Sequence, residues 1–99
     1  MKHMNIGKRI EQEKAVLIPE GWLDTKTAPK FGEEISSLPQ EITELTIDME
    51  KLQYISSAGL RQIVAAHKKM NGALTITNVS PEILGIFKMT GFDKKLDIR

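Results

Sequence analysis

The feature that constrains this chain most is residues 45–61, where a strand pattern runs into a helix pattern through two adjacent serines. Apolar residues occupy every second position from 45 to 49, as they do in a β-strand with one buried face. A short polar segment follows, and a helical pattern begins at about Ser57 and continues to about Asn71. A strand that leads into a helix in this way is typical of α/β folds.

Ser56 and Ser57 lie where the polar segment meets this helix. Backbone N–H groups in the first turn of a helix lack intrahelical partners, and the helix dipole is positive there, so a hydroxyl oxygen or an anion is stabilised. A serine at this place is therefore either a helix cap or a phosphate acceptor, and residue chemistry alone favours Ser57 as a cap. Gly59 in the first turn is expected if another backbone segment comes close; tolerance of glycine at a helix end is the alternative.

The rest of the chain also alternates between strand and helix patterns. We expect strands at residues 6–10, 15–18, 45–49, 74–77 and 95–99, and helices over residues 28–38, from Ser57, and from Ser80-Pro81 to Gly91. The continuous apolar run at 15–18 predicts a strand buried on both faces. The predicted architecture is a single α/β domain over residues 1–99, with residues 1–4 as a disordered tail. It has a mostly parallel sheet of four to five strands, an N-terminal edge strand and about three helices.

Two loops are expected at the same edge of this sheet. Gly21–Asp24 and Gln53–Gly59 each follow a predicted strand, and the carboxyl ends of parallel strands meet at one edge. Asp24 should therefore lie near the two serines, and Asp24 or one of the threonines after it is expected to cap the first helix. Trp22 has two interpretations, as an anchor for a protein partner or as a cover for the edge of the core.

Composition excludes several classes of protein. The net charge is +1, and no apolar run approaches the length of roughly 18 residues that a membrane-spanning helix needs, so we expect neither a nucleic-acid nor a membrane partner. The chain has no cysteine, which fits a reducing compartment, and no secretory signal pattern. A cytoplasmic location is therefore expected.

The sequence also lacks the motifs of catalysis. No glycine-rich nucleotide loop is present, and His3 and His67 do not stand in metal-ligand spacing. Ser57 and His67 are separated by about 15 Å along one helix, which is too far for a catalytic triad. Asp48 lacks the acidic cluster of a phospho-aspartate site. We expect no catalytic residue, no metal and no cofactor.

The segment Tyr54-Ile55-Ser56-Ser57-Ala58-Gly59-Leu60-Arg61 resembles the STAS-domain family of bacterial anti-sigma factor antagonists. In that family a strand with an aspartate precedes a Tyr/Phe-apolar-Asp-Ser-x-Gly-Leu segment that opens a helix, and the serine after the aspartate is phosphorylated. The match places Ser57 on the phosphorylated serine and Gly59-Leu60 on the Gly-Leu pair. Ser56 stands where the family usually has the aspartate, and it is the second choice for the acceptor.

The resemblance covers nearly the whole chain. Gly21-Trp22-Leu23-Asp24 is similar to the family's Gly-x-Leu/Ile-Asp, in which the aspartate helps to bind the partner kinase. The segment from Ser80 to Phe92 is similar to the family's third helix. The partner-binding residues that this resemblance and the position of Trp22 suggest are Asp24, Trp22, Ser56, Ala58, Gly59 and Leu60.

The function implied by the resemblance is that of an anti-sigma factor antagonist, a regulatory binding protein rather than an enzyme. The unmodified protein would bind an anti-sigma serine kinase and release a sigma factor. The kinase would then phosphorylate Ser57 and end the interaction, and a serine phosphatase would reset it. The alternative is a STAS-like interaction module in which both serines only cap the helix, or a small anion- or ligand-binding module that uses the same helix N-terminus.

Overall fold

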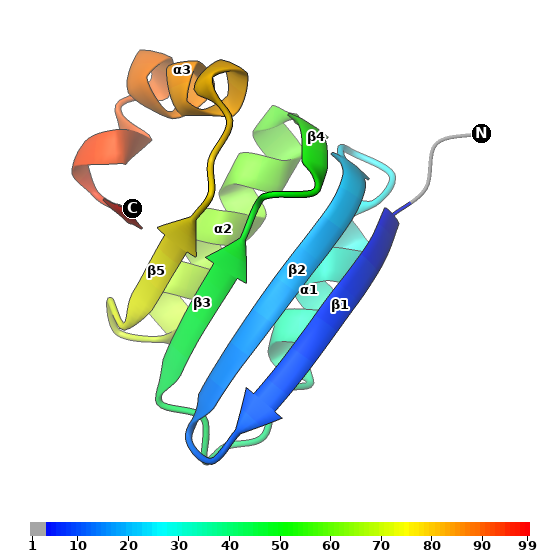
Figure 1. Cartoon of the computed structure of the whole chain (residues 1–99), viewed down its shortest axis with the longest axis vertical. Helices are drawn as coiled ribbons and strands as arrows, with labels where there is room; N and C mark the ends of the chain where they lie inside the picture. Colours follow the sequence, from blue (N-terminus) through cyan, green and yellow to red (C-terminus); the bar gives the residue numbers. More distant parts are fainter. Residues whose placement is uncertain (1–3) are drawn as a thin grey trace.

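The computed structural model describes residues 4–99, in which strands and helices alternate along most of the chain (Figure 1). The strands are β1 (Met4–Glu11), β2 (Lys14–Leu23), β3 (Glu44–Asp48), β4 (Leu52–Ile55), β5 (Leu74–Thr77) and β6 (Asp97–Ile98). The helices are α1 (Ala28–Ser36), α2 (Ser57–Lys69) and α3 (Pro81–Thr90), followed by the 3₁₀ turn η1 (Phe92–Lys94). Within these residues no helix is both long and apolar enough to span a bilayer. The predicted α/β fold with three α-helices is confirmed.

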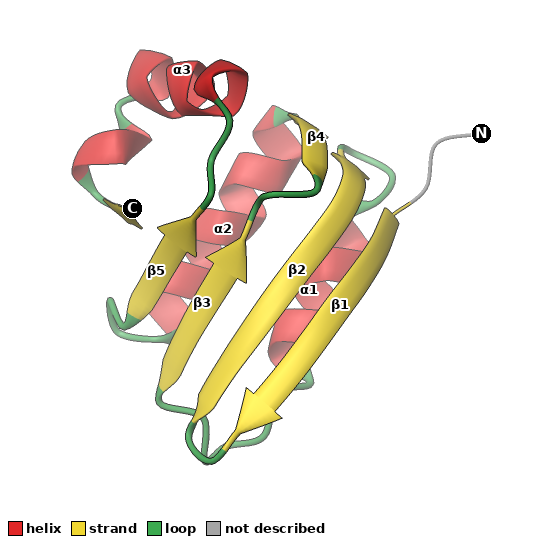
Figure 2. Ribbon diagram, in the orientation of Figure 1, coloured by secondary structure: helices red, strands yellow, loops and turns green. Residues whose placement is uncertain are grey.

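The strands form one mixed sheet (Figure 2). Their order is β1-β2-β3-β5-β6, and β4 pairs with the end of β2. The edge strand β1 is antiparallel to β2, whereas the other pairs are parallel. The sheet has six strands, more than the four to five predicted, because the polar segment before α2 contains the short strand β4.

Helices α1 and α2 cover one face of the sheet, and no helix of residues 4–99 covers the opposite face (Figure 1). Side chains that point toward the helices, such as Leu17, Ile47 and Ile76, are fully buried. Val16 and Ile18 point the other way and are only partly buried. The prediction that residues 15–18 are buried on both faces is therefore wrong, since an apolar run does not reveal that only one face is covered.

The N-terminal strand begins earlier than predicted. Met4, which the sequence placed in a disordered tail, is the first residue of β1 and is buried. Its backbone oxygen accepts a hydrogen bond from Lys30 Nζ of α1 at 3.0 Å, which ties the edge strand to the helix layer. The other residues of the predicted tail, 1–3, lie outside the described residues.

The two predicted loops at the sheet edge consist mostly of strand and helix residues. Strand β2 continues to Leu23, so only Asp24 of the predicted loop Gly21–Asp24 lies beyond it. Within Gln53–Gly59, the first three residues belong to β4 and the last three to α2. The backbone groups of β4 find hydrogen-bonding partners on β2. The sequence of the polar segment alone does not reveal this pairing.

Helix α2 packs very closely on the ends of β2 and β4. A Cβ atom added to Gly59 would lie 2.7 Å from Leu23 Cγ, 2.8 Å from the Leu23 carbonyl oxygen and 2.9 Å from Ile55 Cγ1. The expectation that Gly59 permits a close backbone approach is confirmed. This contact fixes the first turn of α2 against the end of the β2–β4 pair.

Substitution of Gly59 by alanine should destabilise the domain by about 1–3 kcal/mol, because the added methyl group overlaps a backbone oxygen that cannot move without breaking the β2–β4 pairing. The measurement is the midpoint of urea unfolding. Gly85→Ala in α3 is the matched control, because its Cβ would meet nothing within 4 Å and alanine favours a helix by up to about 1 kcal/mol. Equal stability changes in the two variants would contradict the close-approach argument.

Candidate functional site

The N-terminus of α2 is capped by Ser56. Its backbone is extended, with φ −101° and ψ 176°, and its Oγ accepts a hydrogen bond from the Gly59 N–H at 3.4 Å. The Ser56 N–H donates to the Leu23 carbonyl at 2.9 Å, so this residue both ends the strand pairing and begins the helix. The prediction that Ser57 is the cap is wrong, because this backbone bond to β2 shifts the strand-to-helix boundary one residue earlier.

Ser57 is the first residue of α2, and its side chain is exposed. Within residues 4–99 no hydrogen bond engages its hydroxyl group, which is free of the capping role that Ser56 performs. An exposed hydroxyl on an ordered helix start can meet the active site of another protein without local unfolding.

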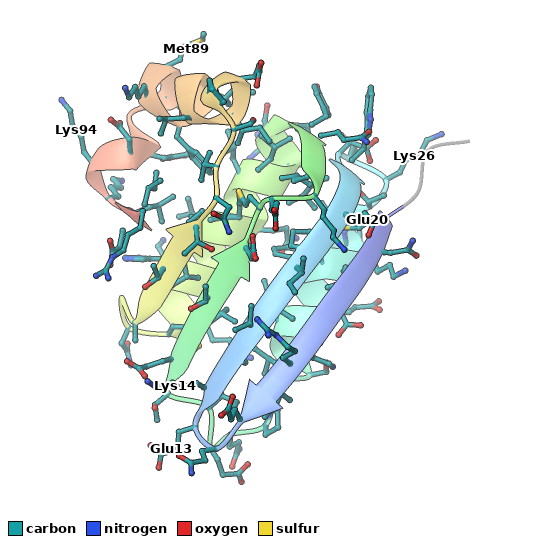
Figure 3. The ribbon with its side chains drawn as sticks, viewed as in Figure 1. Glu13, Lys14, Glu20, Lys26, Met89 and Lys94 are labelled. Atoms are coloured by element: carbon teal, nitrogen blue, oxygen red, sulfur yellow. The ribbon has the colours of Figure 1, made fainter. Side chains whose placement is uncertain are left out.

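Asp24 lies at the end of β2, directly beside this junction. Leu23 pairs with Ile55, so Asp24 and Ser56 are the next residues along two neighbouring strands. The predicted proximity of Asp24 to the serines is confirmed. In Figure 3 the labelled Lys26 of the loop after β2 lies at the same end of the molecule as β4, whereas Glu13 and Lys14 mark the opposite end.

The loop from Asp24 to Thr27 is held by a reciprocal pair of hydrogen bonds. Asp24 Oδ1 accepts from the Thr27 N–H at 3.1 Å, and Thr27 Oγ1 accepts from the Asp24 N–H at 2.8 Å. Thr27 Oγ1 also donates to the Trp22 carbonyl at 2.7 Å, which accounts for the burial of this polar side chain. Thr27 occupies the N-cap position of α1 by its backbone, but no side chain of residues 4–99 caps this helix, because Asp24 Oδ1 accepts from N–H groups of the turn before it; the expectation of a side-chain cap here is wrong.

These bonds also determine the charge of Asp24. The hydrogen bond from the Thr27 N–H lowers the pKa of the Asp24 carboxyl below its ordinary value. Partial desolvation opposes this effect but is smaller. The pKa is lowered further by the Thr27 hydroxyl, the Lys26 N–H and the Lys26 charge. Asp24 is therefore a fixed carboxylate at neutral pH. A group that approaches Ser57 meets this negative charge in a set position.

Trp22 and Tyr54 form an aromatic pair next to the two polar residues. They are paired across β2 and β4, and their ring centroids lie 4.6 Å apart with an interplanar angle of 34°. Trp22 is partly buried, whereas Tyr54 is 40% exposed. Together with Asp24 and Ser57 these rings form what we call the Ser57 cluster.

Sequence reasoning missed Tyr54 as a member of this cluster. A strict alternation from Leu52 would turn Tyr54 inward, but the register shifts between Gly21 and Trp22, so that Leu52 and Ile55 are buried and Tyr54 faces outward beside Trp22. One signal in the sequence was available, because Tyr54 is an aromatic residue that comes directly before Ile55 and the start of the helix. The β-bulge that turns Tyr54 outward has no sequence signature here.

The remaining predicted partner-binding residues divide by burial. Gly59 and Leu60 are buried, Leu60 at 4% exposure, so they shape the surface from beneath. Ala58 is partly buried and packs against the core. Trp22, Asp24 and Ser56 are each partly exposed.

Asp48 has a structural role, and the described residues contain no set of metal ligands. Asp48 Oδ1 accepts hydrogen bonds from the Glu50 N–H and from Asn78 Nδ2, each at 3.0 Å, which joins the ends of β3 and β5. Across the described part of the chain no three His, Cys, Asp or Glu side chains gather in a way that would hold a metal ion.

The fold agrees with comparisons to known proteins. The STAS domain model matches residues 5–99, so this chain belongs to the STAS-domain family. The anti-sigma-B factor antagonist of Bacillus subtilis (strain 168) is 30% identical over 81 residues, which cover 79% of this chain and 74% of that protein.

Solved structures show the same fold. An anti-sigma factor antagonist from Mycobacterium paratuberculosis superposes with a TM-score of 0.86 at 20% identity, covering 96% of this chain and 84% of that one. The Bacillus cell-fate determinant SpoIIAA in its phosphorylated form gives 0.71 at 17% identity, covering 97% and 90%. Unphosphorylated SpoIIAA gives 0.72 at 16% identity, covering 97% and 86%.

The capping assignment predicts different costs for the two serines. Ser56→Ala removes the acceptor of the Gly59 N–H and should lower stability by about 0.5–1 kcal/mol, at the lower end of cap losses because the bond is long. Ser57→Ala should change stability by less than about 0.5 kcal/mol. Thermal unfolding of both variants measures the difference.

Ser80→Ala is the matched positive control, since Ser80 caps α3 through a 3.2 Å bond from the Ile83 N–H. A larger loss for Ser57→Ala than for Ser56→Ala would return the capping role to Ser57.

Proposed function

We propose that this protein is an anti-sigma factor antagonist that binds an anti-sigma serine kinase and is released when the kinase phosphorylates Ser57. The observation that supports this most directly is the division of roles at the start of α2. Ser56 supplies the cap, which leaves the Ser57 hydroxyl exposed and free to react. The relatives named as anti-sigma factor antagonists, at 20–30% identity, agree with the binding role.

The proposed chemistry needs nothing from this chain except the hydroxyl group. Ser57 Oγ attacks the γ-phosphorus of ATP, its proton passes to a base of the kinase, and ADP leaves. The kinase supplies that base, the magnesium ions and the nucleotide. The ordered helix start keeps the hydroxyl in one position for in-line attack.

Phosphorylation would end the interaction by local charge and bulk. The phosphate adds a charge of about −1.5 to −2 at pH 7, beside the fixed carboxylate of Asp24. An interface that fits the unmodified surface would have to desolvate both groups. A change from almost fully bound to almost fully free needs about 5.5 kcal/mol of differential affinity, and one buried doubly charged group supplies much of that.

The domain itself would stay folded, because a phosphate at a helix N-terminus is favourably placed. The two forms of SpoIIAA are consistent with this view, since their TM-scores against this chain are nearly equal, 0.72 unphosphorylated and 0.71 phosphorylated. A serine phosphatase would restore the unmodified surface.

The aromatic pair is the proposed anchor of the docked state. Aromatic side chains are enriched among the residues that dominate binding energy, and Trp22 and Tyr54 are held against each other before any partner arrives. Such pre-organisation lowers the entropy lost on binding. Asp24 would meet a cationic or hydrogen-bond donor group of the kinase.

A second candidate is a STAS interaction module without phosphorylation. The replacement of the family's usual aspartate by Ser56 favours it, since the residue before Ser57 then has no carboxylate. The two candidates differ in whether Ser57 ever receives a phosphoryl group.

Incubation with ATP, Mg²⁺ and the anti-sigma kinase from the same genome should add one phosphate to the protein. Intact-mass spectrometry should show this gain in the native chain and in Ser37→Ala, a control at another exposed serine. Ser57→Ala should show no gain.

Two outcomes would contradict this assignment. A gain that persists in Ser57→Ala but disappears in Ser56→Ala moves the acceptor to Ser56. Binding of the kinase without any phosphorylation supports the interaction module instead.

Trp22→Ala should weaken binding to the kinase by about 2 kcal/mol, close to thirtyfold in dissociation constant, because it removes the buried part of the anchor. Isothermal titration calorimetry measures this. Ile10→Ala is the matched control, an exposed apolar residue near the other end of the sheet that should leave the affinity unchanged. An unchanged affinity in a Trp22→Ala protein that still unfolds cooperatively would rule out the anchor.

A further inference from the structure

The residue four positions after Ser57 is Arg61, an exposed cation in the second turn of α2. Residues four apart lie on the same face of a helix, about one turn from each other. The Cα–Cβ bonds of a helix tilt toward its N-terminus, so the side chain of Arg61 leaves the helix on the side of Ser57.

Arg61 has no anionic partner among the described residues of the unmodified protein. The ion pairs of residues 4–99 are Lys8–Glu34, Lys14–Glu44 and Arg99–Asp97, and the Arg61 side chain makes no hydrogen bond within these residues. Helix α2 contains no aspartate or glutamate, so no residue one turn away can pair with it either.

Arg61 lies apart from the other basic residues of α2. The other basic residues of α2, namely His67, Lys68 and Lys69, lie in its last turn, where the helix dipole favours positive charge. Arg61 lies near the positive end, and the first turn has no acidic residue to balance it. By contrast, the first turn of α3 contains Glu82. The Arg61 charge and the helix dipole would therefore stabilise an anion at the start of α2, where the helix has no acidic residue.

We propose that Arg61 is the internal partner of phosphorylated Ser57. The guanidinium group matches phosphate oxygens in a bidentate arrangement, and a phosphoryl group on Ser57 would supply the missing anion one turn away. Hydrogen bonds from its own loop hold the Asp24 carboxylate in place. Its negative charge would repel the phosphoryl group, which favours a position of that group along the helix, near Arg61. This role rests on the proposed function only in taking Ser57 as the modified residue.

Arg61 is thus a positioning residue for the modified state. It holds the phosphoryl group in its dianionic form on the exposed side of α2, where an approaching kinase surface would contact it. The unmodified chain gains nothing from it, which separates this role from an ordinary contribution to folding.

The test uses phosphoserine incorporated at position 57 during translation, so that no kinase is needed. Titration followed by phosphorus NMR gives the second pKa of the phosphate in the native background, in Arg61→Gln and in Arg61→Lys. The phosphate pKa should be about 0.3–0.7 units higher in Arg61→Gln, a two- to fivefold change in proton affinity, and should lie between the two in Arg61→Lys. The difference should shrink in high salt.

Lys68→Gln is the matched control, because it removes an exposed cation of the same helix about three turns from Ser57. Its phosphate pKa should equal that of the native background. Equal pKa values in Arg61→Gln and the native background would overturn the proposal. A general effect of Arg61 on folding would instead change the unfolding temperature of the unmodified protein, which we expect to be the same with arginine or glutamine.

The outcome is independent of whether the kinase uses Ser57. A phosphate pKa shift without enzymatic phosphorylation of the native chain would refute the proposed switch and leave the Arg61 pairing intact. Enzymatic phosphorylation of Ser57 without a difference in phosphate pKa would support the proposed switch and refute the Arg61 pairing.

Discussion

The close approach of α2 to the end of β2 is the constraint on which the rest of the functional surface depends. Gly59 lies against the Leu23 carbonyl and Ile55 at distances that leave no room for a side chain. One residue before the helix, the Ser56 N–H completes the hydrogen bonding of that same carbonyl. Because both contacts converge on Leu23, the start of α2 and the end of β2 form one packed unit. The spacing between Asp24 and Ser57 follows from this unit rather than from any direct bond between them.

The order of the elements and the place of the candidate site at the start of α2 were predictable from the sequence because they depend on local patterns. The strand before Asp48, the Ser80-Pro81 helix start and the glycine that ends α3 are all recognisable without tertiary information. The proximity of Asp24 to the serines followed from the rule that parallel strands end at one edge. The close packing at Gly59 followed from the cost of glycine in a helix.

What the sequence did not reveal depends on pairing between distant segments. Strand β4 exists because Leu52–Ile55 finds hydrogen-bonding partners on β2, more than 25 residues earlier. The same pairing determines which serine is the cap and turns Tyr54 outward to meet Trp22. The partial exposure of Val16 and Ile18 likewise reflects the absence of a helix on the second face of the sheet among residues 4–99. Each of these depends on where another segment lies, which residue patterns do not encode.

The separation of the cap from the exposed hydroxyl has a consequence for response time. In the proposed switch the chemical change occurs on a side chain that no element of the fold uses, so no helix has to melt and no strand has to leave the sheet. Local unfolding and domain rearrangements take microseconds to seconds, and this surface requires neither. The time course of signalling would then be set by how often kinase and phosphatase molecules encounter the protein, and the cell would tune it through their concentrations.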